Sequence, residues 1–185
     1  MLCYIITLVN LNHIRDTRMQ STPFQQHDHS HCIATAMQQA QGLCQERGVR
    51  LTPVRQRVLE LVWQSHQPLG AYDLLARLGE DGFNSAPPTV YRALDFLQEQ
   101  GLIHKLTSVN AYTGCCSPGT PHEGHFFLCL SCNQALELDT STLQESLQSS
   151  ANTHGFTIAQ QTIEVTGFCA RCLANDKQPG HTQHD

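Results

Sequence analysis

Two closely spaced cysteine pairs are the residues of this sequence with the clearest chemical meaning. Cys129 and Cys132 form one C-x-x-C motif, and Cys169 and Cys172 form a second. Each motif presents two sulfurs from one tight turn, so four thiolates can converge on a single tetrahedral ion, most simply zinc. The 36 residues from 133 to 168 exceed the usual spacing of a zinc ribbon. We therefore expect a small folded domain to bring the pairs together, with the metal stabilising the C-terminal half.

Redox catalysis is the alternative use of such cysteines. A thiol oxidoreductase needs one exposed cysteine with a low pKa, whereas two pairs at matched spacing suit closed metal ligation better. The chain has nine cysteines, an odd number, so at least one would stay unpaired even if the others all formed disulfides. The sequence also shows neither a secretory signal nor a serine, acid and histidine constellation for hydrolysis. We expect reduced cysteines, a cytoplasmic location, no small-molecule substrate and no enzymatic activity.

The length and composition predict two compact units with polar tails. The 185 residues are 40% hydrophobic and 15% charged, which allows one good core or two small ones. The longest apolar run spans 2–9 and is far below the roughly 20 residues that a membrane span needs, so no membrane partner is expected.

The charge distribution differs between the two halves. A net charge of −5 is unusual for a nucleic-acid binder, since basicity is the common signature of such proteins. Residues 44–105 carry seven Lys and Arg against seven Asp and Glu, whereas residues 106–185 carry two against seven. The acidity therefore lies in the C-terminal half.

The ends of the chain show no hydrophobic period. We expect residues 1–32 to form a disordered, histidine-containing tail and residues 175–185 to form a polar tail. The tract 27–32 (HDHSHC) resembles a metal-binding segment, and His181 and His184 echo it weakly. Incidental histidines in polar tails are the simpler interpretation. A zinc-buffering or chaperone protein that uses these tails is the alternative from another functional class.

Capping residues and helical periodicity predict four helices in the N-terminal half. Thr52 and Pro53 are typical of an N-cap and a first helical position. Gly48 and Gly101 are natural helix ends. The first three predicted helices run from Ile33 to Arg47, from Pro53 through Val62, and from Ala71 to Leu78. Pro87 and Pro88 start the last one, which runs from Thr89 to about Gln100.

The last of these helices, followed by two short strands, predicts a winged helix-turn-helix domain over residues 33–107. At about 100° per residue, Val90 and Leu94 share one side of the helix and Arg92 points outward. The segments 102–106 and 110–115 are typical of strands around a polar turn. In the winged arrangement the last helix lies in the DNA major groove. The alternative is a small helical bundle whose Arg92 is merely solvated.

The C-terminal half predicts an α/β unit over residues 108–174, which makes the fold class α+β. Segments 126–130 and 135–139 are typical of strands. Thr140 or Ser141 can cap a helix that runs to about Thr153, and a further strand spans 156–165.

Several motifs in order resemble one known family. They are RLTPVRQRVL from Arg50, AYDLL from Ala71, PPTVYRALDFLQEQGLIHK from Pro87, and then the two C-x-x-C pairs. Together they cover residues 34–174 and resemble the ferric uptake regulator (Fur) family, most closely its zinc uptake regulator branch.

The resemblance implies a homodimeric, metal-dependent transcriptional repressor. Its N-terminal winged helix would bind palindromic operator DNA, its C-terminal domain would dimerise, and zinc uptake genes would be repressed when zinc is sufficient. About two zinc ions per chain are implied. The structural ion maps to the two C-x-x-C pairs, and the regulatory ion maps to His104, Cys115, His122 and Glu137.

The implied regulatory ligands are chemically suited to zinc. One thiolate, two imidazoles and one carboxylate suit tetrahedral Zn²⁺, and the sulfur disfavours harder metals. His104 ends the DNA-binding domain, while His122 and Glu137 lie in the dimerisation half, so binding would brace the hinge. Each of these residues also has an ordinary structural interpretation, as a surface, buried or solvated side chain.

Neighbouring residues offer alternative ligands. Cys116 follows Cys115, but successive strand residues face opposite sides, so the two cannot comfortably reach one ion. His125 could replace His122, and His154 could join a secondary site. The motif His122-Glu-Gly-His125 is sparser than in iron-sensing relatives, so an iron or peroxide sensor is the less favoured alternative.

The resemblance also implies which residues contact DNA. It assigns base reading to Tyr72 and Arg92, with Thr89 and Tyr91 near the start of the recognition helix. A bidentate arginine contributes about 1–3 kcal/mol of discrimination at a guanine. The residues expected at phosphates are Arg50, Arg55 and Arg57.

Overall fold

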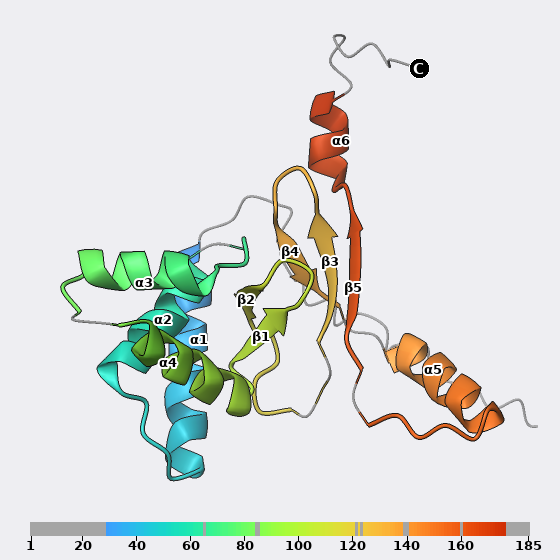
Figure 1. Ribbon diagram of the computed structural model, residues 1–185, viewed down its shortest axis with the longest axis horizontal. Coiled ribbons are helices and arrows are strands. Elements are labelled where there is room, and N and C mark those ends of the chain that lie inside the picture. Colours follow the sequence, from blue (N-terminus) through green and yellow to red (C-terminus); the bar gives the residue numbers. More distant parts are fainter. Residues whose placement is uncertain are drawn as a thin grey trace, which may run out of the picture.

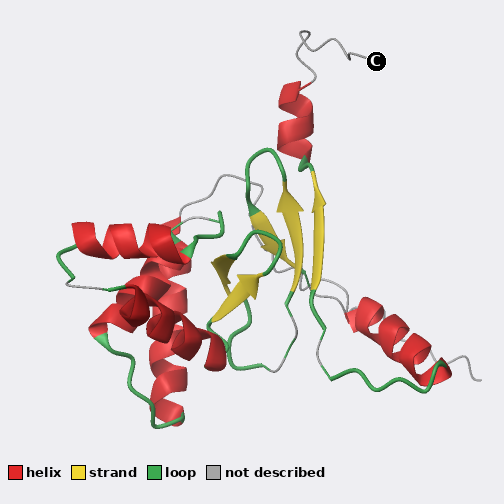
Figure 2. Cartoon of the chain, in the orientation of Figure 1, coloured by secondary structure: helices red, strands yellow, loops and turns green. Residues whose placement is uncertain are grey.

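The computed structural model of this chain describes residues 29–64, 66–83, 86–120, 122, 124–138, 141–159 and 161–176. Helices come first and a mixed α/β segment follows (Figures 1 and 2). The elements of the N-terminal part are α1 (His29–Glu46), α2 (Pro53–Trp63), α3 (Ala71–Glu80), α4 (Pro87–Glu99), β1 (Ile103–Leu106) and β2 (Ala111–Gly114). Those of the C-terminal part are β3 (His125–Cys129), β4 (Ala135–Glu137), α5 (Ser141–Thr153), β5 (Ile163–Gly167) and α6 (Ala170–Asp176). The predicted α+β class is confirmed.

The N-terminal helices form where their capping residues indicate. Thr52 caps α2 by accepting a hydrogen bond from the Arg55 N–H (3.5 Å), and Pro53 occupies the first turn. Gly101 has a φ of +67° just past α4, a conformation that suits glycine. The buried face of α4 packs against α2 and α3, and Arg92 is exposed on the opposite face, as predicted.

A single apolar core joins these helices to the wing, the hairpin of β1 and β2. Leu74 and Leu94 are fully buried in this core, and Ile103 and Tyr112 of the wing belong to the same cluster. The α4 helix and the wing therefore form one packed unit.

The wing is held on the α2–α3 side as well. Leu69 and Tyr112 exchange two backbone hydrogen bonds, both 2.9 Å long. At Gly114 the chain passes so close to Trp63 that a Cβ would overlap the indole ring. Only a glycine fits at this point of the hairpin.

The C-terminal strands form a three-stranded sheet in the order β4-β3-β5, with β3 antiparallel to β4 and parallel to β5. Strand alternation gives this sheet two different faces. Phe126 faces the wing and is buried with Leu106 in one apolar cluster. Phe127 and Val165 are register partners and remain 44% and 45% exposed. In Figure 1 the wing lies between the helical group and this sheet.

Three differences from the predictions are larger than two residues. The first helix begins at His29, so residues 29–32 belong to α1 rather than to a tail. Strand β5 covers Ile163–Gly167 instead of 156–165. Helix α6 was not predicted, because the second C-x-x-C motif was interpreted only as a turn. Residues 1–28 and 177–185, which contain the remaining tail histidines, lie outside the described residues.

No helix in the described ranges is both long and apolar enough to cross a membrane.

Candidate metal centres

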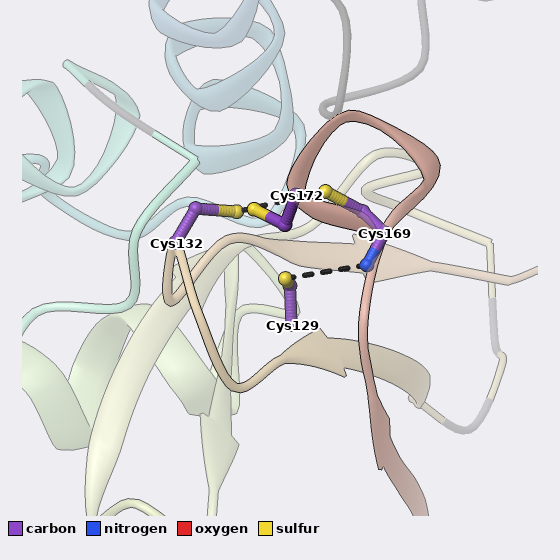
Figure 3. Close-up of side chains that lie close together, drawn as sticks. All are labelled: Cys129, Cys132, Cys169 and Cys172. Carbon is purple, nitrogen blue, oxygen red and sulfur yellow. Dashed lines mark hydrogen bonds between the residues drawn. The ribbon is translucent and has the colours of Figure 1, made fainter. Parts of the chain in front are cut away.

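The four cysteines of the two C-x-x-C motifs meet at one end of the C-terminal sheet (Figure 3). Strands β3 and β5 are parallel neighbours, so their carboxyl ends coincide. Cys129 ends β3 and Cys132 follows in the turn, while Cys169 precedes α6 and Cys172 lies in its first turn. The four sulfur atoms all lie within 4.8 Å of one another. The sheet topology therefore brings together motifs that are far apart in sequence.

The sulfur positions fit a tetrahedral zinc ion. Zn–S bonds of about 2.3 Å place tetrahedral sulfurs about 3.8 Å apart. The Cys132 and Cys169 sulfurs are 3.9 Å apart, and all four residues are free thiols. Burial alone would raise the pKa of the Cys129 thiol, but nearby backbone N–H groups lower it, including that of Cys169, 3.3 Å from the sulfur. That N–H group favours the thiolate, which is the form that binds metal.

A second group of donors lies where the wing meets the sheet. Its four ligand atoms, from His104, Cys115, His122 and Glu137, all lie within 4.8 Å of one another. His104 Nε2 and His122 Nε2 are 2.9 Å and 2.8 Å from the same carboxylate oxygen, Glu137 Oε1. Cys115 Sγ is 3.4 Å from His122 Nε2. The structure thus groups the four residues that the family resemblance indicated.

These separations are close to those of a tetrahedral zinc complex. Typical bond lengths place two nitrogen ligands about 3.3 Å apart, and a nitrogen and a sulfur about 3.6 Å apart. The two imidazole Nε2 atoms are 3.2 Å apart. The carboxylate contacts of 2.8–2.9 Å are shorter, as expected for hydrogen bonds between the ligands themselves.

Neighbouring backbone groups orient two of the four ligands. Thr120 O lies 2.7 Å from His122 Nδ1 and can accept its proton, which leaves Nε2 directed at the site. The Cys116 N–H donates to Glu137 Oε2 (2.8 Å), which turns Oε1 toward the two imidazoles. Sequence reasoning missed both groups, because Cys116 was considered only for its sulfur and backbone donors have no residue signature.

Gly124 leaves room for the His104 ring beside the sheet, because it has no Cβ. A Cβ at Gly124 would lie 2.5 Å from the Phe126 ring and 3.0 Å from His104 Nδ1. The His104 ring also packs edge-on against Phe126, with their centroids 5.4 Å apart. His104 is therefore held from the sheet side as well as by its own strand.

The electrostatics of this group favour a bound cation. Burial would raise the pKa of Glu137, but the hydrogen bond and charge of His104 and the other donors lower it to about 2. Burial would lower the pKa of His122, yet the Thr120 carbonyl and Glu137 raise it above its ordinary value. Burial and the Glu137 charge raise the pKa of the Cys115 thiol to about 12, although the Ser117 backbone opposes them. A metal ion must displace protons here, so binding weakens as the pH falls.

The other candidate ligands stay outside both groups. Among the described residues, neither set of clustered ligand atoms includes Cys116, His125 or His154. Cys116 is exposed, and His125 is buried in β3. The first-choice ligands therefore have the better geometry.

The predicted DNA contacts lie on the N-terminal helices. Tyr72 is 75% exposed on α3, and Tyr91 and Arg92 are exposed on the first half of α4. Thr89 is half-buried in the first turn of α4. Tyr72, Tyr91 and Arg92 are therefore accessible to a partner.

The three predicted phosphate contacts differ in their surroundings. Arg50 is exposed. The Arg55 guanidinium lies 3.5 Å from the centroid of the Phe96 ring and donates to the Arg50 carbonyl at 2.7 Å. Arg57 pairs with Asp81 at 2.7 Å. Arg55 and Arg57 already have partners within the chain, which sequence patterns did not reveal.

Comparison with known proteins identifies the family. The sequence pattern of the ferric uptake regulator family matches residues 46–166. The chain belongs to this family. The zinc uptake regulation protein of Escherichia coli (strain K12) is 39% identical over 150 residues, covering 80% of this chain and 88% of that protein.

Two solved structures are similar to this ferric uptake regulator family member. One is a zinc uptake regulator complexed with zinc and DNA, with a TM-score of 0.72, 37% identity, and coverage of 82% of this chain and 99% of that one. The other is the crystal structure of holo XcZur, with a TM-score of 0.69, 42% identity, and coverage of 76% and 98%.

The raised pKa of His122 in this family member can be tested without metal. Glu137→Gln removes the negative charge beside the imidazole and keeps the side-chain size, so the His122 pKa should fall. NMR titration of the imidazole protons in metal-free protein measures the change. Glu145→Gln, an equal charge change on the exposed face of α5, is the control. An unchanged His122 pKa in Glu137→Gln would contradict the contact.

Proposed function

We propose that this protein is a zinc-responsive transcriptional repressor that binds palindromic operator DNA as a zinc-loaded homodimer and represses zinc uptake genes. The observation that carries the proposal is the mixed donor group of two imidazoles, one thiol and one carboxylate at the junction of wing and sheet. The similarity to zinc uptake regulators, one of them complexed with zinc and DNA, supports the choice of metal and partner.

The two metal centres have different roles in this proposal. Cys129, Cys132, Cys169 and Cys172 hold a structural zinc that closes the end of the sheet. His104, Cys115, His122 and Glu137 hold the regulatory zinc, for a total of about two ions per chain. Closed thiolate sites of the first kind contribute directly to folding, whereas a site with mixed ligands at a hinge can fill and empty.

The regulatory site acts by joining two parts of the molecule. His104 lies on β1 and Cys115 follows β2, so both belong to the wing. Glu137 lies on β4, in the sheet that would carry the dimer contact. Zinc binds better when these parts are held together and shifts the population toward that arrangement. By reciprocity, operator DNA tightens zinc by the same factor.

The DNA-binding part, residues 33–107, presents α4 to the major groove. Arg92 reads a base, Tyr72, Thr89 and Tyr91 contact the same site, and Arg50 contacts phosphate. Arg55 and Arg57 are secondary phosphate contacts, because their guanidinium groups also bind Phe96 and Asp81. Binding by an acidic protein through so few cations should be salt-sensitive.

The dimerising part, residues 108–174, uses the exposed face of its sheet. Phe127 and Val165 lie side by side on that face, and Phe168, which is 55% exposed, follows β5. Exposed apolar side chains that gather in this way indicate a protein interface. A second copy of the chain would cover them. Because a bacterial repressor acts on DNA in the cytoplasm, we expect the protein to work there.

An iron- or peroxide-sensing repressor is the second candidate, and metal selectivity decides between them. Purified dimer should bind an AT-rich palindromic promoter fragment when buffered free zinc is raised, because the thiolate and imidazole donors favour zinc. Gel-shift titrations with zinc, iron and manganese measure this. An equal response to iron at physiological levels would contradict the zinc proposal.

Cys115→Ser should separate the regulatory from the structural role. The variant should remain a folded dimer with about one zinc per chain, yet bind the operator at least about ten-fold more weakly, because a thiolate ligand is lost. Metal analysis, gel filtration and gel shift measure these properties.

Cys116→Ser is the matched control for that experiment. It changes the neighbouring exposed sulfur but keeps the backbone N–H that holds Glu137, so it should behave as wild type. An unfolded or monomeric Cys115→Ser protein would contradict the division into two kinds of site.

Arg92→Ala should reduce sequence discrimination. Losing one base contact should cost about 1–3 kcal/mol on the operator and much less on unrelated DNA. Arg171→Ala removes the same charge from α6, where the side chain donates to Gln134, and should leave the preference unchanged. An equal loss on both DNAs would instead assign Arg92 to a phosphate.

A further inference from the structure

Glu164 occupies an unexpected face of the C-terminal sheet. Its position in β5 is the register partner of Phe126, on the side that packs against the wing. The sequence Ile163-Glu-Val165 would ordinarily turn its apolar residues toward the core and the glutamate toward solvent. Here Val165 is exposed on the opposite face, and the carboxylate is directed at the wing. A charge on the packed side needs a compensating partner.

The partner of Glu164 is the backbone of the wing turn. Thr107 N–H donates to one carboxylate oxygen at 2.6 Å, and Ser108 N–H donates to the other at 3.0 Å. The turn is a tight one that closes at Asn110, whose φ is +47°. Burial alone would raise the pKa of Glu164, but the Ser108 and Thr107 hydrogen bonds lower it below the usual value.

We propose that Glu164 is a positioning residue that fixes the orientation of the wing, and with it the recognition helix α4, on the dimerisation sheet, and that operator binding requires it. The inference rests on the proposed function of zinc-dependent DNA binding. It adds a contact that holds the hairpin without using a metal ligand.

Two attachments fix an orientation that one attachment cannot. The regulatory group holds the base of the hairpin through His104, and Glu164 holds the turn at Thr107. The two positions are three steps apart along the chain, a distance of about 10 Å in an extended strand. The apolar contact of Leu106 between them is non-directional and permits sliding. The α2–α3 loop also contacts the sheet, where the Ala135 N–H donates to the His66 carbonyl (2.9 Å), but Glu164 is the contact that reaches the turn of the wing. With Glu164 free, the turn could swing about these remaining points.

Rotation of the wing would displace the DNA-reading surface. The Leu102 N–H donates to the Leu97 carbonyl at the end of α4, and the Cys115 N–H donates to the Leu102 carbonyl. The wing and α4 also share one buried core. Two recognition helices in a dimer must match successive major grooves, so a small angular error at the wing would weaken binding to a palindrome.

Glu164→Gln tests this role. The amide keeps the size of the side chain but can accept only through one oxygen, and its NH₂ group would face a backbone donor. At saturating zinc, affinity for the palindromic promoter fragment should fall about ten-fold. Zinc content and dimerisation should be unchanged. Amide hydrogen exchange at Thr107 and Ser108 should become faster, a local change that general destabilisation would not confine to the turn.

Glu145→Gln is the matched control, since it removes an equal charge from the same part of the chain and should have wild-type affinity. Glu164→Asp, which keeps the charge but shortens the reach, should lie between wild type and Glu164→Gln. If Glu164→Gln fails to fold, the operator affinity of Glu164→Asp still tests whether Glu164 positions the wing.

Three results would overturn the inference. Unchanged operator affinity would show that the contact does not position the wing. Increased affinity would show that Glu164 blocks two amides that otherwise bind a DNA phosphate. Wild-type affinity in Glu164→Asp, with Glu164→Gln unfolded, would assign the residue to folding alone. A wild-type protein whose DNA binding ignores zinc would instead contradict the proposed function.

Discussion

The buried carboxylate of Glu137 is the constraint on which the arrangement of the chain depends. One oxygen contacts two imidazoles and the other accepts the Cys116 N–H, so its partners come from three separate segments. A buried carboxylate that loses such partners is strongly unfavourable. The wing, the loop after it and the sheet are therefore held together by one ionised group. A cation bound among the four ligand atoms would join the same three segments more strongly.

The two metal centres differ in how they relate to the rest of the fold. The cysteine group closes the end of a sheet whose strands already pair, and its turn is linked to the α2–α3 loop by a Gln67 hydrogen bond to the Cys132 carbonyl (3.0 Å). The mixed group instead takes its ligands from two different parts of the chain, the wing with the loop after it and strand β4 of the sheet. Occupancy of the first centre would thus stabilise the fold, whereas occupancy of the second would change the balance between arrangements.

Local patterns explain what the sequence could predict. Thr52, Pro53 and Gly101 act on their immediate neighbours, so the helices they bound were predicted nearly to the residue. The cysteine pairs were recognisable because each motif is short. His104 and Glu137 are 33 positions apart and depend on the docking of wing on sheet, so only the family resemblance linked them.

Residues whose role depends on tertiary contacts were predicted less well. Glu164 was not identified because strand alternation predicts that apolar Val165 faces the core and Glu164 faces solvent. In the structure Val165 is on the exposed apolar face of the sheet, so Glu164 faces the wing. Helix α6 is too short for a clear period, and the hydrogen bonds of Arg57 to Asp81 cross 24 positions. In each case the deciding neighbour is distant in sequence.

The close approach of Trp63 to Gly114 has a practical consequence. It is the single tryptophan of the chain, and its indole lies against the residue that directly precedes Cys115 of the mixed donor group. Indole emission depends on the polarity and mobility of the groups that touch the ring. The protein thus contains a native optical probe beside its hinge, and its fluorescence can follow occupancy of that site without any attached label.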